Sequence, residues 1–290
     1  MPLVYLAAWH TPAHVLMLRG FYRCSMASGS SFARALVRAV PTFIFACVAM
    51  AGSPFEGAAA SDPLLQQALA AEAAFDSATA LKCFLQLDAQ KTDDGFVLQK
   101  ISRQYSDLTL DTTDEAEKQR LCEQALQYSQ RAATVQPNNA VNQLSLAICY
   151  GKLAGYSSTR RKLEYSKLVK RHADEALRLD PSYDYAYHVL GRWHYEVASL
   201  GAGTRFLVKL IYGGLPPAST AEAVRLLARS TELAPDLPSH RVELGFALLA
   251  DGQKNAAMEA FSRALSMPRR EKYDLESFAR ARNALATSRP

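Results

Sequence analysis

Three prolines of this 290-residue chain are each followed, nine residues later, by a leucine and a small residue. The prolines and their pairs are Pro137 with Leu146-Ala147, Pro181 with Leu190-Gly191, and Pro235 with Leu244-Gly245. This pattern is typical of tetratricopeptide-type repeats, each of which is a pair of antiparallel helices. The small residue lets the two helices approach closely, and a large residue fills the space opposite. The sequence therefore predicts an all-α fold, a tetratricopeptide-like solenoid of antiparallel helix pairs.

Two of the repeats are predicted to be enlarged. Pro137 and Pro181 are 44 residues apart, and Pro181 and Pro235 are 54 apart, whereas an ordinary repeat has about 34 residues. We place the two insertions near residues 157–167 and 200–218, within a repeat region that covers residues 137–290. Apolar residues at three-to-four spacing predict further amino-terminal helical repeats over residues 61–136. The amphipathic segment 271–286 is expected to cap the stack.

Residues 1–60 are predicted to be a leader. Arg34 and Arg38 precede an apolar run over residues 40–52, and small residues follow at 57–60, as in a secretory signal that is cleaved near residues 60/61. The run is shorter than the roughly 20 residues of a membrane span. We expect a protein that is exported, periplasmic or secreted, and the alternative is an anchor with a single amino-terminal membrane span. A chain that began at Met26 would have a signal of ordinary length. We therefore hypothesise that residues 1–25 are an artefact of the chosen start codon.

The composition and the motifs argue against several classes of function. The formal net charge is +5, and residues 1–60 hold four arginines and one acid, so the remainder carries only about +2. This charge is too small to predict nucleic-acid binding. No Cys-x-x-Cys is present, and we expect no metal or cofactor. Because motifs of metalloproteases, phosphate-binding loops and serine hydrolases are also absent, we expect no catalytic residues and no enzyme.

The inner surface of a repeat array is its usual binding face. Positions two, five, nine and twelve of the first helix in each repeat should line this inner surface. In the middle repeat these positions hold polar and aromatic residues, and in the last repeat they hold mostly apolar residues. The candidate residues are Tyr185, His188, Arg192, Tyr195, Phe246 and Leu249. Arg192 would hold a carboxylate or phosphate beside ring contacts. On this view Arg192→Ala weakens partner binding with little loss of stability.

The second insertion carries an apolar segment between glycines. Its large apolar residues are Phe206, Leu207, Leu210, Ile211 and Tyr212. An apolar insertion has to be buried somewhere. It could fold over its own stack, cover a hydrophobic cavity, or touch a membrane, and the residues alone leave these three alternatives open.

The first insertion is basic. Its cations are Arg160, Arg161, Lys162, Lys167, Lys170 and Arg171, with two tyrosines interleaved. Such a patch could contact phosphate groups, an acidic protein tail or anionic lipid. The alternative is a solvated helix face, because acids elsewhere nearly neutralise the molecule.

From about residue 141 to 286 the chain resembles the regulator of microtubule dynamics family, and its composition and leader are typical of a bacterial relative. The resemblance is carried by Leu146–Leu153, Leu179-Asp180-Pro181, Leu190–Ala198, Pro216–Thr220 and Glu222-Ala223. It implies an all-helical domain without catalytic residues. Members of the family are microtubule-associated, and one is a membrane-contact tether whose repeat domain holds phospholipid.

Three functional hypotheses follow. The first is a non-enzymatic scaffold that recognises a protein or peptide partner in its concave groove. The second is a domain that binds or transfers a lipid or another apolar ligand in a cavity beneath residues 201–217. The third is a microtubule-associated or membrane-contact adaptor, as the resemblance implies. A protein or peptide is the expected partner, with phospholipid or a membrane surface as the alternative, and nucleic acid is not expected.

Overall fold

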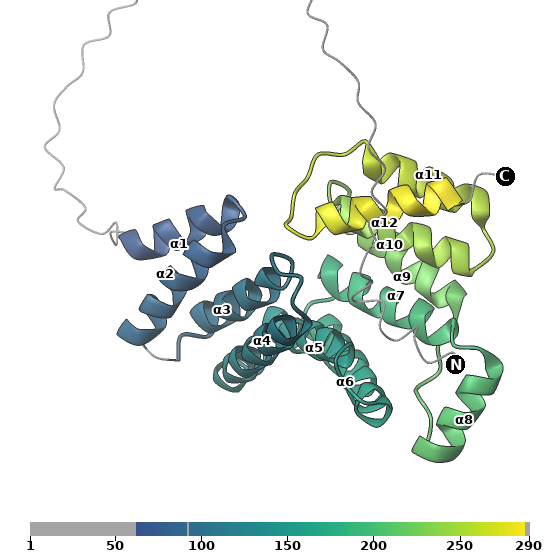
Figure 1. Ribbon diagram of the computed structural model, residues 1–290, viewed down its shortest axis with the longest axis horizontal. Coiled ribbons are helices and arrows are strands. Elements are labelled where there is room, and N and C mark those ends of the chain that lie inside the picture. The colour runs from purple at the N-terminus through teal and green to yellow at the C-terminus, as the bar shows by residue number, and fades with distance from the viewer. Residues whose placement is uncertain (1–61, 92, 288–290) are drawn as a thin grey trace, which may run out of the picture. The chain divides into compact units, whose positions relative to one another are not determined.

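The computed structural model describes residues 62–91 and 93–287, and this part of the chain is entirely helical (Figure 1). Its helices are α1 (Pro63–Ala73), α2 (Ser77–Gln90), α3 (Gly95–Leu108), α4 (Glu115–Val135), α5 (Ala140–Ala154), α6 (Thr159–Leu179), α7 (Asp184–Ala198), α8 (Ala202–Tyr212), α9 (Thr220–Leu233), α10 (Pro238–Ala250), α11 (Lys254–Leu265) and α12 (Asp274–Thr287). The predicted all-α class is confirmed. The predicted leader lies outside the described residues.

Side-chain caps fix where the first five helices begin. Asp62, Asp76, Asp94, Asp114 and Asn139 precede α1 to α5, and each side-chain oxygen accepts a hydrogen bond from a backbone N–H of the first turn. These N–H groups have no partner within the helix, so the cap supplies one. The short polar residues between apolar stretches therefore divide the chain into helices of the observed lengths.

The helices pack as antiparallel pairs that follow one another along the chain (Figure 1). The pairs are α1 with α2, α3 with α4, α5 with α6, α7 with α9, and α10 with α11, while α12 packs against α10 and α11. The first helices also contact one another in the order α3, α5, α7, α10. This is the helical-repeat arrangement that the proline and leucine pattern predicts, because each pair buries its apolar faces against its neighbours.

Two glycines set the closest approach within the last two pairs. A Cβ atom at Gly191 would lie 2.5 Å from Leu227 Cγ, and one at Gly245 would lie 2.5 Å from the Phe261 ring. Both opposing side chains are fully buried. Small residues at these positions are thus required by packing, as the sequence predicts.

Gly245→Ala is therefore expected to lower the free energy of unfolding by about 1–3 kcal/mol, because the buried Phe261 ring has to move. The helix propensity of alanine, worth at most ~1 kcal/mol, offsets part of this loss. Urea denaturation measures the difference. Gly201→Ala serves as the control, since a Cβ there meets nothing within 4 Å. Equal stability of the two variants would contradict the close packing.

The two predicted insertions have different structures. Residues 159–167 form the first turns of α6, which has 21 residues, as does α4. The second insertion forms α8 and an irregular segment that leads to α9. Val208 of α8 is buried against Leu163 of α6 and against Leu200, with Leu215 packed on the same cluster. One face of α8 is thereby attached to the repeats.

Candidate functional site

The predicted groove residues differ in how far they are exposed. Arg192 is only 3% exposed and His188 only 8%. The remaining four are half-buried, and they are Tyr185, Tyr195, Phe246 and Leu249. Arg192, which was predicted to hold a carboxylate or phosphate, is thus buried, and its role in binding stays a prediction.

Arg192 lies in a buried network of charges between α7, α10 and α12. Its Nε donates to Glu196 Oε1 at 2.8 Å, and its Nη1 donates to Tyr273 Oη at 3.0 Å. The same Nη1 lies 3.5 Å from Glu243 Oε1. Arg280 of α12 donates to both oxygens of Glu243 and, at 2.8 Å, to Tyr273 Oη. These contacts give Arg192 a structural role.

Glu243 is the anion at the centre of this network and is fully buried. Burial alone would raise the pKa of its carboxyl, but the attraction of Arg280 and Arg192 is larger and lowers the pKa to about 2. The carboxylate therefore stays ionised at neutral pH and balances two guanidinium groups. The network joins α12 to α7 and α10.

A chain of ring nitrogens runs beside these charges. The Nδ1 atoms of His188 and His240 are 2.9 Å apart, and His240 Nε2 is 2.8 Å from Asp184 Oδ2. A hydrogen bond between two ring nitrogens needs one donor and one acceptor, so the two rings cannot both be protonated at Nδ1. Burial, with repulsion from His240, lowers the pKa of His188 to about 3. His188 is therefore a neutral interior residue.

The segment that leads into α12 contacts the amino-terminal helices as well. Arg103 of α3 donates to Glu271 at 3.2 Å, and Lys272 Nζ donates to Ser77 Oγ at 3.0 Å. The guanidinium carbon of Arg269 lies 4.1 Å from the centroid of the Phe75 ring. In Figure 1 the loop between α11 and α12 lies beside the turn between α1 and α2. The protein's own carboxy-terminal segment thus covers part of the face that was predicted to be the groove.

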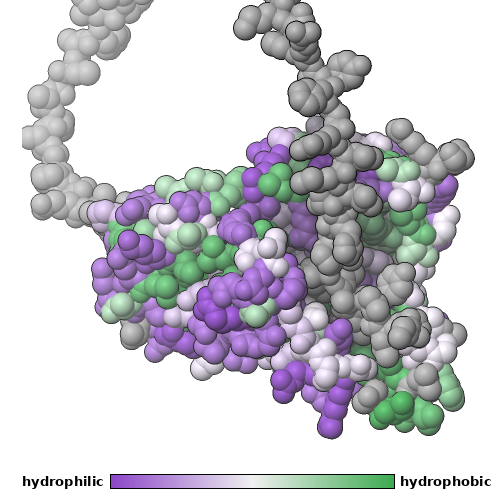
Figure 2. Space-filling model, in the orientation of Figure 1, coloured by the Kyte–Doolittle hydropathy of each residue, from purple (hydrophilic) through white to green (hydrophobic). Residues whose placement is uncertain are grey.

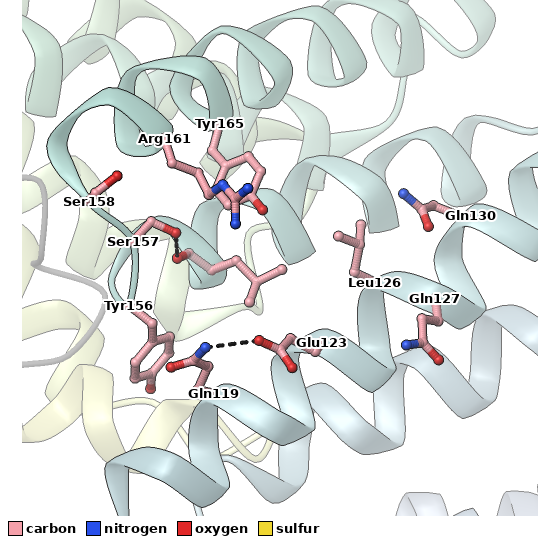
Figure 3. Close-up of a pocket in the computed structure, with 11 residues that line it drawn as sticks. Gln119, Glu123, Leu126, Gln127, Gln130, Tyr156, Ser157, Ser158, Arg161 and Tyr165 are labelled. Atoms are coloured by element: carbon pink, nitrogen blue, oxygen red, sulfur yellow. Dashed lines mark hydrogen bonds between the residues drawn. The ribbon is translucent and has the colours of Figure 1, made fainter.

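A separate cleft of about 470 Å³ lies between α4 and the start of α6 (Figure 3). Arg161 and Tyr165 of α6 point into it from one side, while Gln119 and Glu123 of α4 form the opposite wall. Its full lining is Gln119, Glu123, Leu126, Gln127, Gln130, Leu153, Tyr156, Ser157, Ser158, Arg161 and Tyr165. The α4 wall extends from Gln119 to Gln130 along that helix, whereas the α6 wall comes from the first two turns of α6.

The cleft is lined mainly by groups that form hydrogen bonds. Three glutamine amides can each donate and accept, as the backbone of an extended peptide requires. Gln119 Nε2 donates to Glu123 Oε1 at 2.9 Å, which holds that pair along the α4 wall. Glu123 and the exposed Arg161 place opposite charges on opposite walls. The cleft can therefore orient a segment that carries both amide groups and charge.

The six cations of the predicted basic patch differ in their contacts and exposure. Arg160 pairs with Glu164 at 3.2 Å, and Lys170 pairs with Asp174 at 2.7 Å. Arg171 Nη2 lies 3.0 Å from His172 Nε2. Lys162 is half-buried and Lys167 is exposed. Of the six predicted cations, Arg161 lines the cleft.

The apolar insertion shows a hydrophobic surface, visible as the green patch over α8 in Figure 2. Phe206, Leu210 and Ile211 are 64%, 71% and 62% exposed. The side chains of Leu207 and Tyr212 lie outside the described part. Leu163, Leu200, Val208 and Leu215 pack together beneath α8. Within the described residues, no helix has the length and apolar character to cross a membrane.

The α4 wall of the cleft was missed by the sequence reasoning. Gln119, Glu123, Gln127 and Gln130 recur at three-to-four spacing, which places them on one face of a helix. This polar stripe is opposite the apolar face of the same helix and has the appearance of ordinary solvent-exposed surface. Only the projecting start of α6 turns the stripe into the wall of a cleft.

A family model described as Regulator of microtubule dynamics protein 1-3 matches residues 64–289. Regulator of microtubule dynamics protein 1 of Mus musculus is 26% identical over 161 residues, which cover 55% of this chain and 53% of that protein. Regulator of microtubule dynamics protein 3 of Xenopus laevis is 28% identical over 138 residues, covering 48% and 30%. A thermophilic tetratricopeptide-repeat protein of Thermus thermophilus has a TM-score of 0.55 at 20% identity, covering 77% of this chain and 97% of that one. The chain thus spans about half or less of these curated relatives.

Proposed function

The chain belongs to the regulator of microtubule dynamics family, and we propose that it is a non-enzymatic scaffold that binds an extended segment of a partner protein in the cleft between α4 and α6. The family resemblance drawn from the sequence is confirmed, and the helical-repeat fold is that of protein-interaction scaffolds. A bacterial origin, export, a lipid-carrier role and a microtubule role stay predictions.

The lining of the cleft is the observation that supports this proposal. A volume of about 470 Å³ is within the range of roughly 300–1,000 Å³ that is usual for ligand sites. Glutamine amides on α4 match the alternating N–H and C=O groups of an extended peptide, and Arg161 suits a carboxylate of that peptide. The inner face is a poorer candidate, because Tyr273 and Arg280 contact Arg192 and Glu243 there.

Arg161→Glu is expected to weaken peptide binding at least tenfold, which is about 1.4 kcal/mol. Peptides are selected on the full chain by phage display of a random library, and their affinities are then measured by fluorescence polarisation. The fold should tolerate this change, because Arg161 lies in the first turn of α6, where an acid is favourable to the helix dipole.

Lys167→Glu is the matched control. It makes the same change of charge on the same helix, at an exposed residue that does not line the cleft. Gln127→Ala removes one amide of the α4 wall without changing the charge and should also weaken binding. Equal losses from Arg161→Glu and Lys167→Glu would indicate only a general charge effect. Losses confined to substitution of Phe246 or Leu249 would place the partner on the inner face instead.

A further inference from the structure

α8 presents an apolar face that no described part of the chain covers. Phe206, Leu210 and Ile211 are each more than 60% exposed and lie within six residues. The other large apolar residues that are exposed occur one to a helix, namely Phe96 on α3, Val135 on α4, Val141 on α5 and Leu275 on α12. Single exposed apolar residues are normal on a protein surface, whereas a cluster on one short helix indicates an interaction site.

The opposite side of α8 is attached to the repeats. Val208 is 5% exposed and packs with Leu163 and Leu200. Successive residues of a helix are rotated by ~100°, so Phe206 and Leu210 lie on the side away from Val208. The helix is therefore held by one face while its apolar side points outward (Figure 2).

The charged residues of α8 itself are both positive. Arg205 and Lys209 are exposed on α8, at the edge of the helix that adjoins Phe206. No acidic residue occurs between Gly201 and Ala221. Leu163 of α6 packs against α8, but in the turn before it Arg160 pairs with Glu164 at 3.2 Å and Arg161 lines the cleft, so the cations of this face are those of α8. An apolar arc bordered by cations is the pattern of a helix that lies in the interface of an anionic membrane.

We propose that α8 docks on the surface of an anionic lipid bilayer. Phe206, Leu210 and Ile211 enter the boundary between headgroups and acyl chains, and Arg205 and Lys209 contact the lipid phosphates. The helix lies in the plane of the membrane and does not cross it, and this interaction is separate from the peptide cleft.

Size and charge favour a bilayer over another protein. An 11-residue helix is about 16 Å long and about 10 Å wide, so one face offers far less than the ~800 Å² per partner of a stable protein interface. Docking of a second copy through α8 would bring Arg205 and Lys209 of both copies together, and like charges across an interface repel. A fluid anionic surface satisfies both the apolar arc and the cations.

The test is co-sedimentation of the full chain with vesicles of phosphatidylcholine alone or of phosphatidylcholine and phosphatidylserine in equal amounts. The wild type should bind the anionic vesicles, more weakly at high salt. The triple variant Phe206→Ser, Leu210→Ser, Ile211→Ser should bind at least tenfold more weakly. Leu275→Ser is the matched control, because Leu275 is an apolar residue that is 56% exposed on α12. The double variant Arg205→Gln, Lys209→Gln should lose the salt-dependent part of the binding.

Hydrogen exchange separates α8 from the leader, whose apolar run could bind vesicles independently. Amides of residues 202–212 should exchange more slowly on anionic vesicles in the wild type and in Leu275→Ser, but not in the triple variant. The proposal is overturned if the α8 amides exchange equally fast with and without vesicles. It is also overturned if sedimentation shows that the exposed triad mediates self-association, or if a captured protein partner needs the triad while vesicles do not.

Discussion

Glu243→Ala is expected to lower the free energy of unfolding by about 3–5 kcal/mol, the usual cost of removing one partner from a buried ion pair. The carboxylate is fully buried and lies between two guanidinium groups, with Arg280 donating to it directly and Arg192 Nη1 at 3.5 Å. Removing it leaves both cations in the interior without this anion. Urea denaturation at neutral pH, followed by far-ultraviolet circular dichroism, measures the loss.

Glu259→Ala is the control for this prediction. It removes a carboxylate that is 73% exposed and lies 4.0 Å from Arg263, so the expected change is below ~1 kcal/mol. Arg192→Ala should also destabilise the protein, because it removes the cation that pairs with Glu196 and one of the two guanidinium groups beside Glu243. If Arg192→Ala reduced peptide affinity while stability remained unchanged, Arg192 would have the ligand-binding role that the sequence alone suggests.

The repeat pattern could be predicted because it depends on neighbours in the sequence. Gly191 and Gly245 each follow the leucine that lies nine residues after a proline. Each has to be small because a side chain of the partner helix in the same pair lies against it. Gly191 meets Leu227, and Gly245 meets Phe261. Periodicity and turn residues are sufficient for such local packing.

The surroundings of Arg192 could not be predicted in this way. Tyr273, which accepts its hydrogen bond, is 81 residues away in the sequence, and Arg280, which shares Glu243, belongs to a helix predicted only to cap the stack. The position of an arginine on a helix face does not show whether a distant segment folds over it. The cleft was missed for a related reason, since its walls depend on the lengths of α4 and α6.

Acidification from about pH 7 to about pH 5 is expected to destabilise the protein, partly through His188. Burial, followed by repulsion from His240, lowers the pKa of His188 from 6.5 to about 3 in the folded state. Glu243 opposes this shift, while Arg192 and Arg280 reinforce it. Between these two pKa values the unfolded chain binds a proton that the folded chain does not bind. The contribution of His188 to stability is therefore complete above pH 6.5 and is lost as the pH falls toward 3.

His188→Asn isolates this contribution. Below about pH 6 the wild type should lose close to 1.4 kcal/mol per pH unit on account of His188, and the variant should lack that part of the slope. Urea denaturation at several pH values measures both slopes. His172→Asn is the comparison, because burial and the charge of Arg171 lower the pKa of the half-buried His172 to about 4. The stability that His172 contributes should therefore begin to fall at the same pH as that of His188, but the fall should end at a higher pH. Parallel pH profiles of His188→Asn and the wild type would instead show that the pKa of His188 is not lowered in the folded state.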